Sequence, residues 1–160
     1  MNAREAIKLS LDTGHMVFSA YLEGLSDADL MRRASPGINH INWQLGHLIV
    51  AEHQMVGKAC PGAMPALPAG FAEKYAKETA GSDDASQFCS KAELLKTAHE
   101  QRTATVAALE KLTDADLDQQ TGIPYAPTVG SLFSLQGSHT LMHAGQWAVV
   151  RRQLGHKPIF

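Results

Sequence analysis

Cysteine is scarce in this sequence, with only Cys60 and Cys89 among 160 residues. The two form no CxxC motif, and there is no second pair from which to build a disulfide framework. We therefore expect two unpaired structural thiols. A catalytic cysteine partnered by a histidine is the alternative, but no local motif supports it.

An excess of positive charge is also absent. Lysine and arginine number 14 against 16 aspartates and glutamates, which gives a formal net charge of −2. Such a chain has no basic field to hold a phosphate backbone and no polybasic segment for an anionic bilayer. We expect neither nucleic acid nor a membrane among its partners.

Long uncharged apolar runs are missing as well. The first 22 residues carry Arg4, Glu5, Lys8 and Asp12 at intervals, so they hold no secretory hydrophobic segment. No later run is long enough to span a bilayer, and we expect a cytoplasmic protein. Hydrophobic residues make up 44% and charged residues 19%, a profile typical of a globular chain. The length suits a single domain over residues 1–160.

Helical periodicity, by contrast, is abundant. Four segments show it, at residues 2–24, 38–58, 90–111 and 129–155, and no comparable strand pattern is seen. The sequence therefore predicts an all-α fold of four long helices. The segment between the second and third helices is rich in Pro and Gly at its start. We expect a long crossover here. A connection of this length does not require the two helices that it joins to be antiparallel neighbours. Its residues are also candidates for a lid over one end of the bundle.

A short motif occurs twice, as "LSDADL" at residues 25–30 and "LTDADL" at residues 112–117. Each copy is a capping box, with Ser26 or Thr113 as the N-cap and an aspartate three residues later. The flanking leucines are placed to form a hydrophobic staple. Each copy should start a short helical turn between two long helices, which gives two helical hairpins of similar plan.

The last predicted helix places two histidines on its inward face. A rotation of 100° per residue groups His139 and His143 with apolar side chains. The face consists of Leu132, Leu135, Gln136, His139, His143, Gln146, Trp147, Val150 and Leu154. Arg151 and Arg152 fall off this face, and we expect them at the solvent side.

The second predicted helix contributes a further inward histidine. The projection groups His40, Trp43, His47, Val50, Ala51 and Gln54 on one face. His47 is mid-helix, whereas His40 lies near the helix start, where it is placed to line the mouth of a site. His53 turns away from this face, and we expect it at the surface.

Three inward neutral imidazoles need partners, because each unmet hydrogen bond costs about 1–3 kcal/mol. Histidines at i and i+4 offer two ligands to a divalent transition metal, and a third from a facing helix completes the set. Three protein ligands leave positions open for water or substrate, as in catalytic sites. From spacing alone, core histidines bonded to backbone carbonyls remain the alternative. Gln146 is placed to orient a water, to bind the metal or to bond another side chain.

The segments "INWQLGHL" (41–48) and "HTLMHAGQW" (139–147) resemble the DinB-like superfamily of four-helix metal-binding proteins. The "LPAGFAEKY" loop, the "TVGSLF" helix start and the closing "LGHKPIF" are also similar to that family. The resemblance implies an up-down-down-up bundle with a long crossover between helices two and three. It further implies that His47, His139 and His143 hold a divalent metal, commonly nickel, zinc or iron, and that the protein is a homodimer.

The resemblance leaves several functions open. Some members transfer low-molecular-weight thiols such as bacillithiol, mycothiol or glutathione, and others are described as metal-dependent hydrolases. Our leading hypothesis is thiol transfer to an electrophilic small molecule, with Trp43, Trp147 and the crossover lining the pocket. It fits the lack of an inward acid near the histidines, since Glu52 lies about 140° off the His47 face.

Two alternatives stay open beside thiol transfer. Hydrolysis by metal-activated water would need a proton shuttle, for which His40, His99 and Glu73 are the candidates. The second alternative is a bundle without catalytic activity, in which the metal only joins the two hairpins. Metal binding would then contribute chiefly to folding stability.

Overall fold

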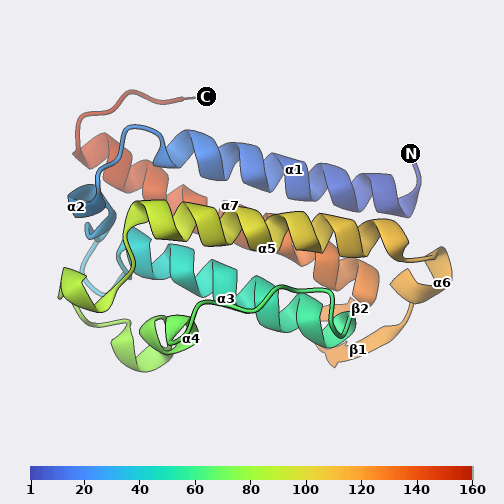
Figure 1. Ribbon diagram of the computed structural model, residues 1–160. Coiled ribbons are helices and arrows are strands. Elements are labelled where there is room, and N and C mark those ends of the chain that lie inside the picture. The colour runs from blue at the N-terminus through green and yellow to red at the C-terminus, as the bar shows by residue number, and fades with distance from the viewer. Residues whose placement is uncertain (160) are drawn as a thin grey trace.

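Four long helices form the bundle in the computed structural model, which describes residues 1–159 (Figure 1). They are α1 (Ala3–Leu22), α3 (Ile41–Ala59), α5 (Lys91–Lys111) and α7 (Val129–Gln153). Each lies within three residues of a predicted helix at both ends. The all-α bundle expected from the sequence is confirmed.

The helices run up, down, down and up. In Figure 1, α1 and α7 run in one direction, and α3 and α5 run in the other. The parallel course of α3 and α5 follows from their contacts, because Asn42 bonds Cys89 near both starts and Glu52 pairs with Arg102 further along. Helix α7 packs most extensively on α1 and also contacts α3. This is the topology that the family resemblance implied.

A long crossover returns the chain from the end of α3 to the start of α5 (Figure 1). It contains three short helical turns: α4 (Phe71–Lys74), η1 (Lys77–Thr79) and η2 (Ala85–Gln87). Its main anchor is Tyr75, which is buried against α3. The Tyr75 hydroxyl donates to Asn42 Oδ1 at 3.2 Å and accepts from the Cys89 backbone N–H at 2.9 Å. The crossover is therefore tied to α3 and to the start of α5.

The two repeated motifs form short helices, as predicted. They are α2 (Asp27–Leu30) and α6 (Asp114–Leu117). Ser26 and Thr113 are the N-caps, and both capping boxes are complete. The leucines that flank each motif pack into the core, which fixes the angle between successive long helices.

A small hairpin was not predicted. Strands β1 (Gln120–Ile123) and β2 (Ala126–Thr128) pair antiparallel before α7. Strands of four and three residues are too short for an alternating pattern to emerge from the sequence. Ala126 is fully buried and β2 contacts α7, so the hairpin closes the end of the bundle away from α2.

Arg151 is buried, so the prediction that it faces solvent is wrong; Arg152 is exposed as predicted. The Arg151 Nη1 donates to the backbone carbonyls of Tyr21 and Glu23 at the end of α1. Helix α1 has no basic residue in its own last turn. A cation from α7 therefore satisfies its free carbonyls and offsets the negative end of its dipole.

The buried face of α3 is wider than predicted. Residues 41–46 are all buried, and Glu52 is 7% exposed and pairs with α5. Gln54, predicted to face inward, is exposed. His53, predicted at the surface, is half-buried, with its Nδ1 3.1 Å from Gln101 Oε1. The reason is that α5, α7 and the crossover cover α3 from different sides, whereas the projection assumed one inward stripe.

The two cysteines are free and half-buried, as predicted. Burial raises the pKa of the Cys60 thiol, which makes it a poor nucleophile. Separately, no helix within residues 1–159 combines the length and the apolar character needed to cross a membrane.

Candidate metal centre

Three histidines from two helices, α3 and α7, meet inside the bundle. His47 comes from the second turn of α3, and His139 and His143 lie one turn apart on α7. The Nε2 atoms of His139 and His143 are 3.2 Å apart, and a ring nitrogen of His47 lies within 4.8 Å of both ligand atoms. The structure thus brings together the three residues that the sequence singled out.

The spacing of these nitrogens fits a metal. Two histidines on a tetrahedral zinc, at about 2.0–2.1 Å each, hold their nitrogens roughly 3.3 Å apart. The 3.2 Å between His139 and His143 matches this separation. His47 completes a set of three imidazoles, which suits zinc, nickel or iron. The three rings meet edge to face or tilted, with centroids 5.0–5.6 Å apart.

The three imidazoles are neutral at pH 7. Burial, followed by the neighbouring histidines, lowers the pKa of His139 and of His143 to about 4. Burial also lowers the pKa of His47. No acidic side chain within residues 1–159 contributes to any of these shifts. The lone pairs needed by a metal are therefore available without deprotonation.

His47 is held by a ring stack. Its imidazole lies parallel to the Trp43 indole, with centroids 5.1 Å apart and an interplanar angle of 6°. The Trp43 Nε1 donates to Ala76 O at 3.2 Å and to Thr79 Oγ1 at 3.0 Å, both in the crossover. The crossover therefore fixes Trp43, and Trp43 in turn fixes the plane of His47.

Gln44 is the residue that the sequence analysis missed. Its Oε1 lies 2.9 Å from Trp147 Nε1 and 3.0 Å from His143 Nδ1. Its Nε2 donates to Gln146 Oε1 at 2.9 Å. Gln44 thus joins α3 to a ligand on α7. An available signal was its position three residues before His47, because a glutamine buried on this helix needs partners.

Gln146 and Trp147 contact the centre through Gln44. Of the roles left open for Gln146, the structure shows the bond to another side chain, since its oxygen accepts from Gln44. Trp147 is fully buried and packs edge-on against Phe18 at 5.8 Å. It has no exposed surface with which to line an open pocket. Trp43, by contrast, stacks directly on a histidine of the centre, His47.

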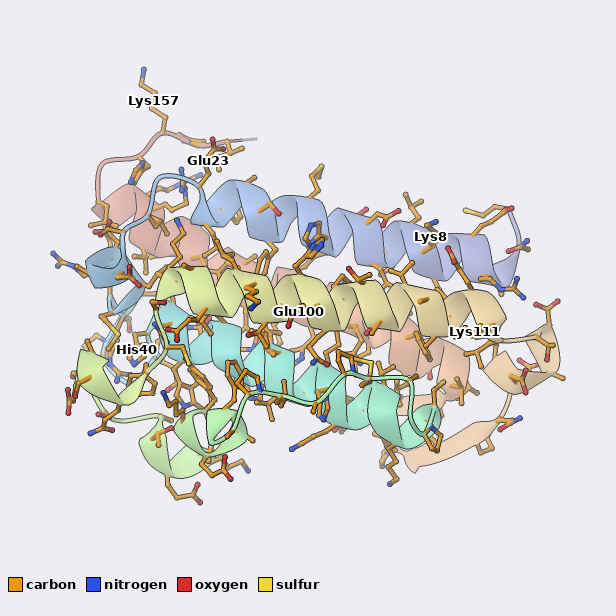
Figure 2. The ribbon with its side chains drawn as sticks, in the orientation of Figure 1. Lys8, Glu23, His40, Glu100, Lys111 and Lys157 are labelled. Atoms are coloured by element: carbon orange, nitrogen blue, oxygen red, sulfur yellow. The ribbon has the colours of Figure 1, made fainter. Side chains whose placement is uncertain are left out.

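His40 lies at the start of α3, seven residues before His47 (Figure 2). It is fully buried, its Nδ1 accepts from the Trp43 backbone N–H at 3.0 Å, and its ring packs against Phe88. Burial, followed by the charge of Arg33, lowers its pKa to about 4. His40 is therefore the N-cap of α3 and does not line the mouth of the site, since it has no exposed surface.

The remaining candidates for a proton shuttle, His99 and Glu73, do not bond the three histidines, and neither does Glu52. The Glu52 carboxylate is bound by the Arg102 guanidinium, with contacts of 2.9 and 3.0 Å. His99 and Glu73 are exposed on α5 and on the crossover, and neither bonds a histidine of the centre. Within residues 1–159, the three imidazoles therefore have no adjacent acid.

The fold and the three histidines define a helical-bundle protein with a site suited to a divalent metal. The sequence profile of the DinB superfamily matches residues 10–147, and the chain belongs to this superfamily. The structure is also similar to the crystal structure of a conserved protein from Enterococcus faecalis, with a TM-score of 0.69 and 15% sequence identity. That match covers 98% of this chain and 99% of the other, and it supports the fold alone. The comparison with curated proteins gives no match.

Proposed function

We propose that this protein is a metal-dependent enzyme that transfers a low-molecular-weight thiol to an electrophilic small molecule. The observation that carries the proposal is the set of three neutral histidines without an acid beside them. His47, His139 and His143 would hold a zinc, nickel or iron ion and leave positions open for exogenous ligands. Membership of the DinB superfamily agrees with a metal site of this kind.

A bound metal would lower the pKa of a thiol and favour its thiolate. The three histidines would hold the ion, and Trp43 would keep the His47 ring parallel to its own indole ring. The transfer forms a carbon–sulfur bond, the leaving group departs with the electron pair of the bond that breaks, and the thiol proton passes to water. No protein base is required, which agrees with the surroundings of the histidines.

Hydrolysis is less well supported by the same surroundings. Activation of water commonly uses a carboxylate or a histidine within hydrogen-bond reach as a general base. Among residues 1–159 the one buried carboxylate, Glu52, is bound by Arg102. Thiol transfer therefore agrees better with the residues present.

The first test is metal content. We expect about one metal ion per chain in the purified protein and a loss of that metal in His143→Ala. His99→Ala is the matched control, because His99 is an exposed histidine on α5 away from the centre. Wild-type protein that neither contains metal nor takes it up would refute the proposal at its first step.

The second test is thiol dependence. The cobalt or nickel form is titrated with bacillithiol, mycothiol and glutathione while its visible absorption is followed. Consumption of 1-chloro-2,4-dinitrobenzene is then measured, a reaction in which a carbon–sulfur bond replaces the carbon–chlorine bond. We expect one thiol to change the spectrum and to support turnover that chelation abolishes. Ester or amide turnover without thiol, also abolished by chelation, would favour hydrolysis.

A further inference from the structure

We propose that Gln44 is a positioning residue that selects the tautomer of His143, so that the Nε2 of His143 presents a lone pair to the metal position. This inference rests on the proposed metal site and concerns a residue outside the three histidines. It follows from hydrogen-bond chemistry around one buried amide that is 2% exposed.

The orientation of the Gln44 amide is fixed from both sides. The Trp147 indole N–H is only a donor, so the Gln44 atom that faces it at 2.9 Å must be the oxygen. The backbone carbonyl of Asn39 is only an acceptor, so the atom that faces it must be the amide nitrogen. The two constraints agree, and a flipped amide would oppose donor to donor and acceptor to acceptor.

The orientation of Gln44 then determines the proton on His143. Gln44 Oε1 can only accept, so His143 Nδ1, which lies 3.0 Å away, must carry the hydrogen. A neutral imidazole with a proton on Nδ1 has its lone pair on Nε2. The Nε2 of His143 faces the Nε2 of His139 at 3.2 Å, within the histidine cluster. A side chain of α3 thereby prepares a ligand on α7.

The other two histidines lack such a partner. Within residues 1–159, neither His47 nor His139 makes a side-chain hydrogen bond outside the cluster. His47 is held by its stack on Trp43 instead. His143 is therefore the ligand whose ring and tautomer are set before metal binds, and loss of its outer partner should weaken metal binding by about 10–100-fold.

The chain offers a closely matched control in Gln101. This glutamine is 1% exposed, and its Oε1 lies 3.1 Å from His53 Nδ1. Its Nε2 donates to the Pro65 carbonyl at 2.9 Å. Gln101→Met and Gln44→Met therefore remove the same kind of buried amide, but only Gln44 contacts a histidine of the metal centre.

The first experiment measures zinc and cobalt affinity by competition with a chelator, together with the visible spectrum of the cobalt form. We expect Gln44→Met to bind about 10–100-fold more weakly and to shift the cobalt bands, and Gln101→Met to match wild type. Urea unfolding of the metal-free variants separates loss of binding from loss of folding.

The second experiment needs no metal. Nitrogen chemical shifts of the histidine rings in the metal-free protein report which nitrogen of His143 carries the proton. We expect the Nδ1–H tautomer in wild type and a larger share of Nε2–H in Gln44→Met. An Nε2–H tautomer in wild type, or unchanged metal affinity in Gln44→Met, would overturn the role of Gln44. A wild-type protein that shows the Nδ1–H tautomer but binds no metal would overturn the metal site instead.

Discussion

Gly46→Ala tests how the crossover is held against α3. A Cβ atom at position 46 would lie 2.1–2.3 Å from three ring carbons of Tyr75. Carbon atoms in contact prefer about 3.5–4.0 Å, so the ring would have to move by more than an ångström. The Tyr75 ring lies between Phe71 and Phe88, and its hydroxyl holds Asn42 and the Cys89 backbone. The ring therefore cannot move without moving the crossover.

The magnitude follows from three contributions. Overpacking costs about 1–3 kcal/mol, and the two hydrogen bonds of the Tyr75 hydroxyl contribute about 1 kcal/mol each. Alanine is favoured over glycine within a helix by roughly 1 kcal/mol, which offsets part of the loss. We expect the free energy of unfolding to fall by about 2–4 kcal/mol. Because Gly46 adjoins His47, metal affinity should fall as well.

Urea unfolding of the metal-free protein measures this change. Gly145→Ala on α7 is the control, because a Cβ at Gly145 meets no atom within 4 Å and should stabilise the helix by about 0.5–1 kcal/mol. In a Tyr75→Ala background the clash disappears, and Gly46→Ala should then be neutral or stabilising. A destabilisation that is the same with and without the Tyr75 ring would refute the reasoning.

Three further predictions concern stability. Glu52→Leu should lower the free energy of unfolding by about 3 kcal/mol, because it leaves the Arg102 cation, whose side chain is only 14% exposed, without its carboxylate partner. Glu52→Leu combined with Arg102→Met should recover most of this loss, and urea unfolding measures both. Metal-free wild type should lose stability as the pH falls from about 6.5 to 4, because the unfolded chain takes up protons that the half-buried His139 and His143 do not. The loss should be smaller when both are replaced by glutamine, and equal losses would contradict this account. Thr113→Ala should lower the free energy of unfolding by about 1 kcal/mol through the lost cap of α6, whereas no change would mean that this cap is not needed.

Elements of the fold could be predicted from the sequence where a single pattern, such as helical periodicity or a capping box, identified them. The four long helices follow from periodicity, and α2 and α6 follow from their capping boxes. The three histidines could be placed together because two lie one turn apart on α7 and the third faces inward on α3. The hairpin before α7 escaped prediction because its strands are too short to show a period.

Arg151 and His40 show a different limit. Each satisfies backbone groups at a helix end, Arg151 at the end of α1 and His40 at the start of α3. Histidine is not among the preferred N-cap residues, and Arg151 lies far along the chain from the helix end that it serves, so the local sequence gives no warning of either role. Only the packing of α1 on α7, and of α3 on the crossover, reveals them.

Residues 41–47 of α3 show why the roles of the side chains in one helix could be predicted only in part. Asn42 bonds the crossover and the start of α5, Gln44 bonds α7, Gly46 admits the Tyr75 ring, and His47 joins the metal centre. Asn42 and Gly46 lie one turn apart and both face Tyr75 of the crossover, whereas Gln44 and His47 face α7. More than one side of this helix is therefore occupied. A projection that seeks one inward stripe identifies His47 and overlooks Gln44. Substitutions in this segment should therefore couple to one another, because each alters the position of a helix on which the others depend.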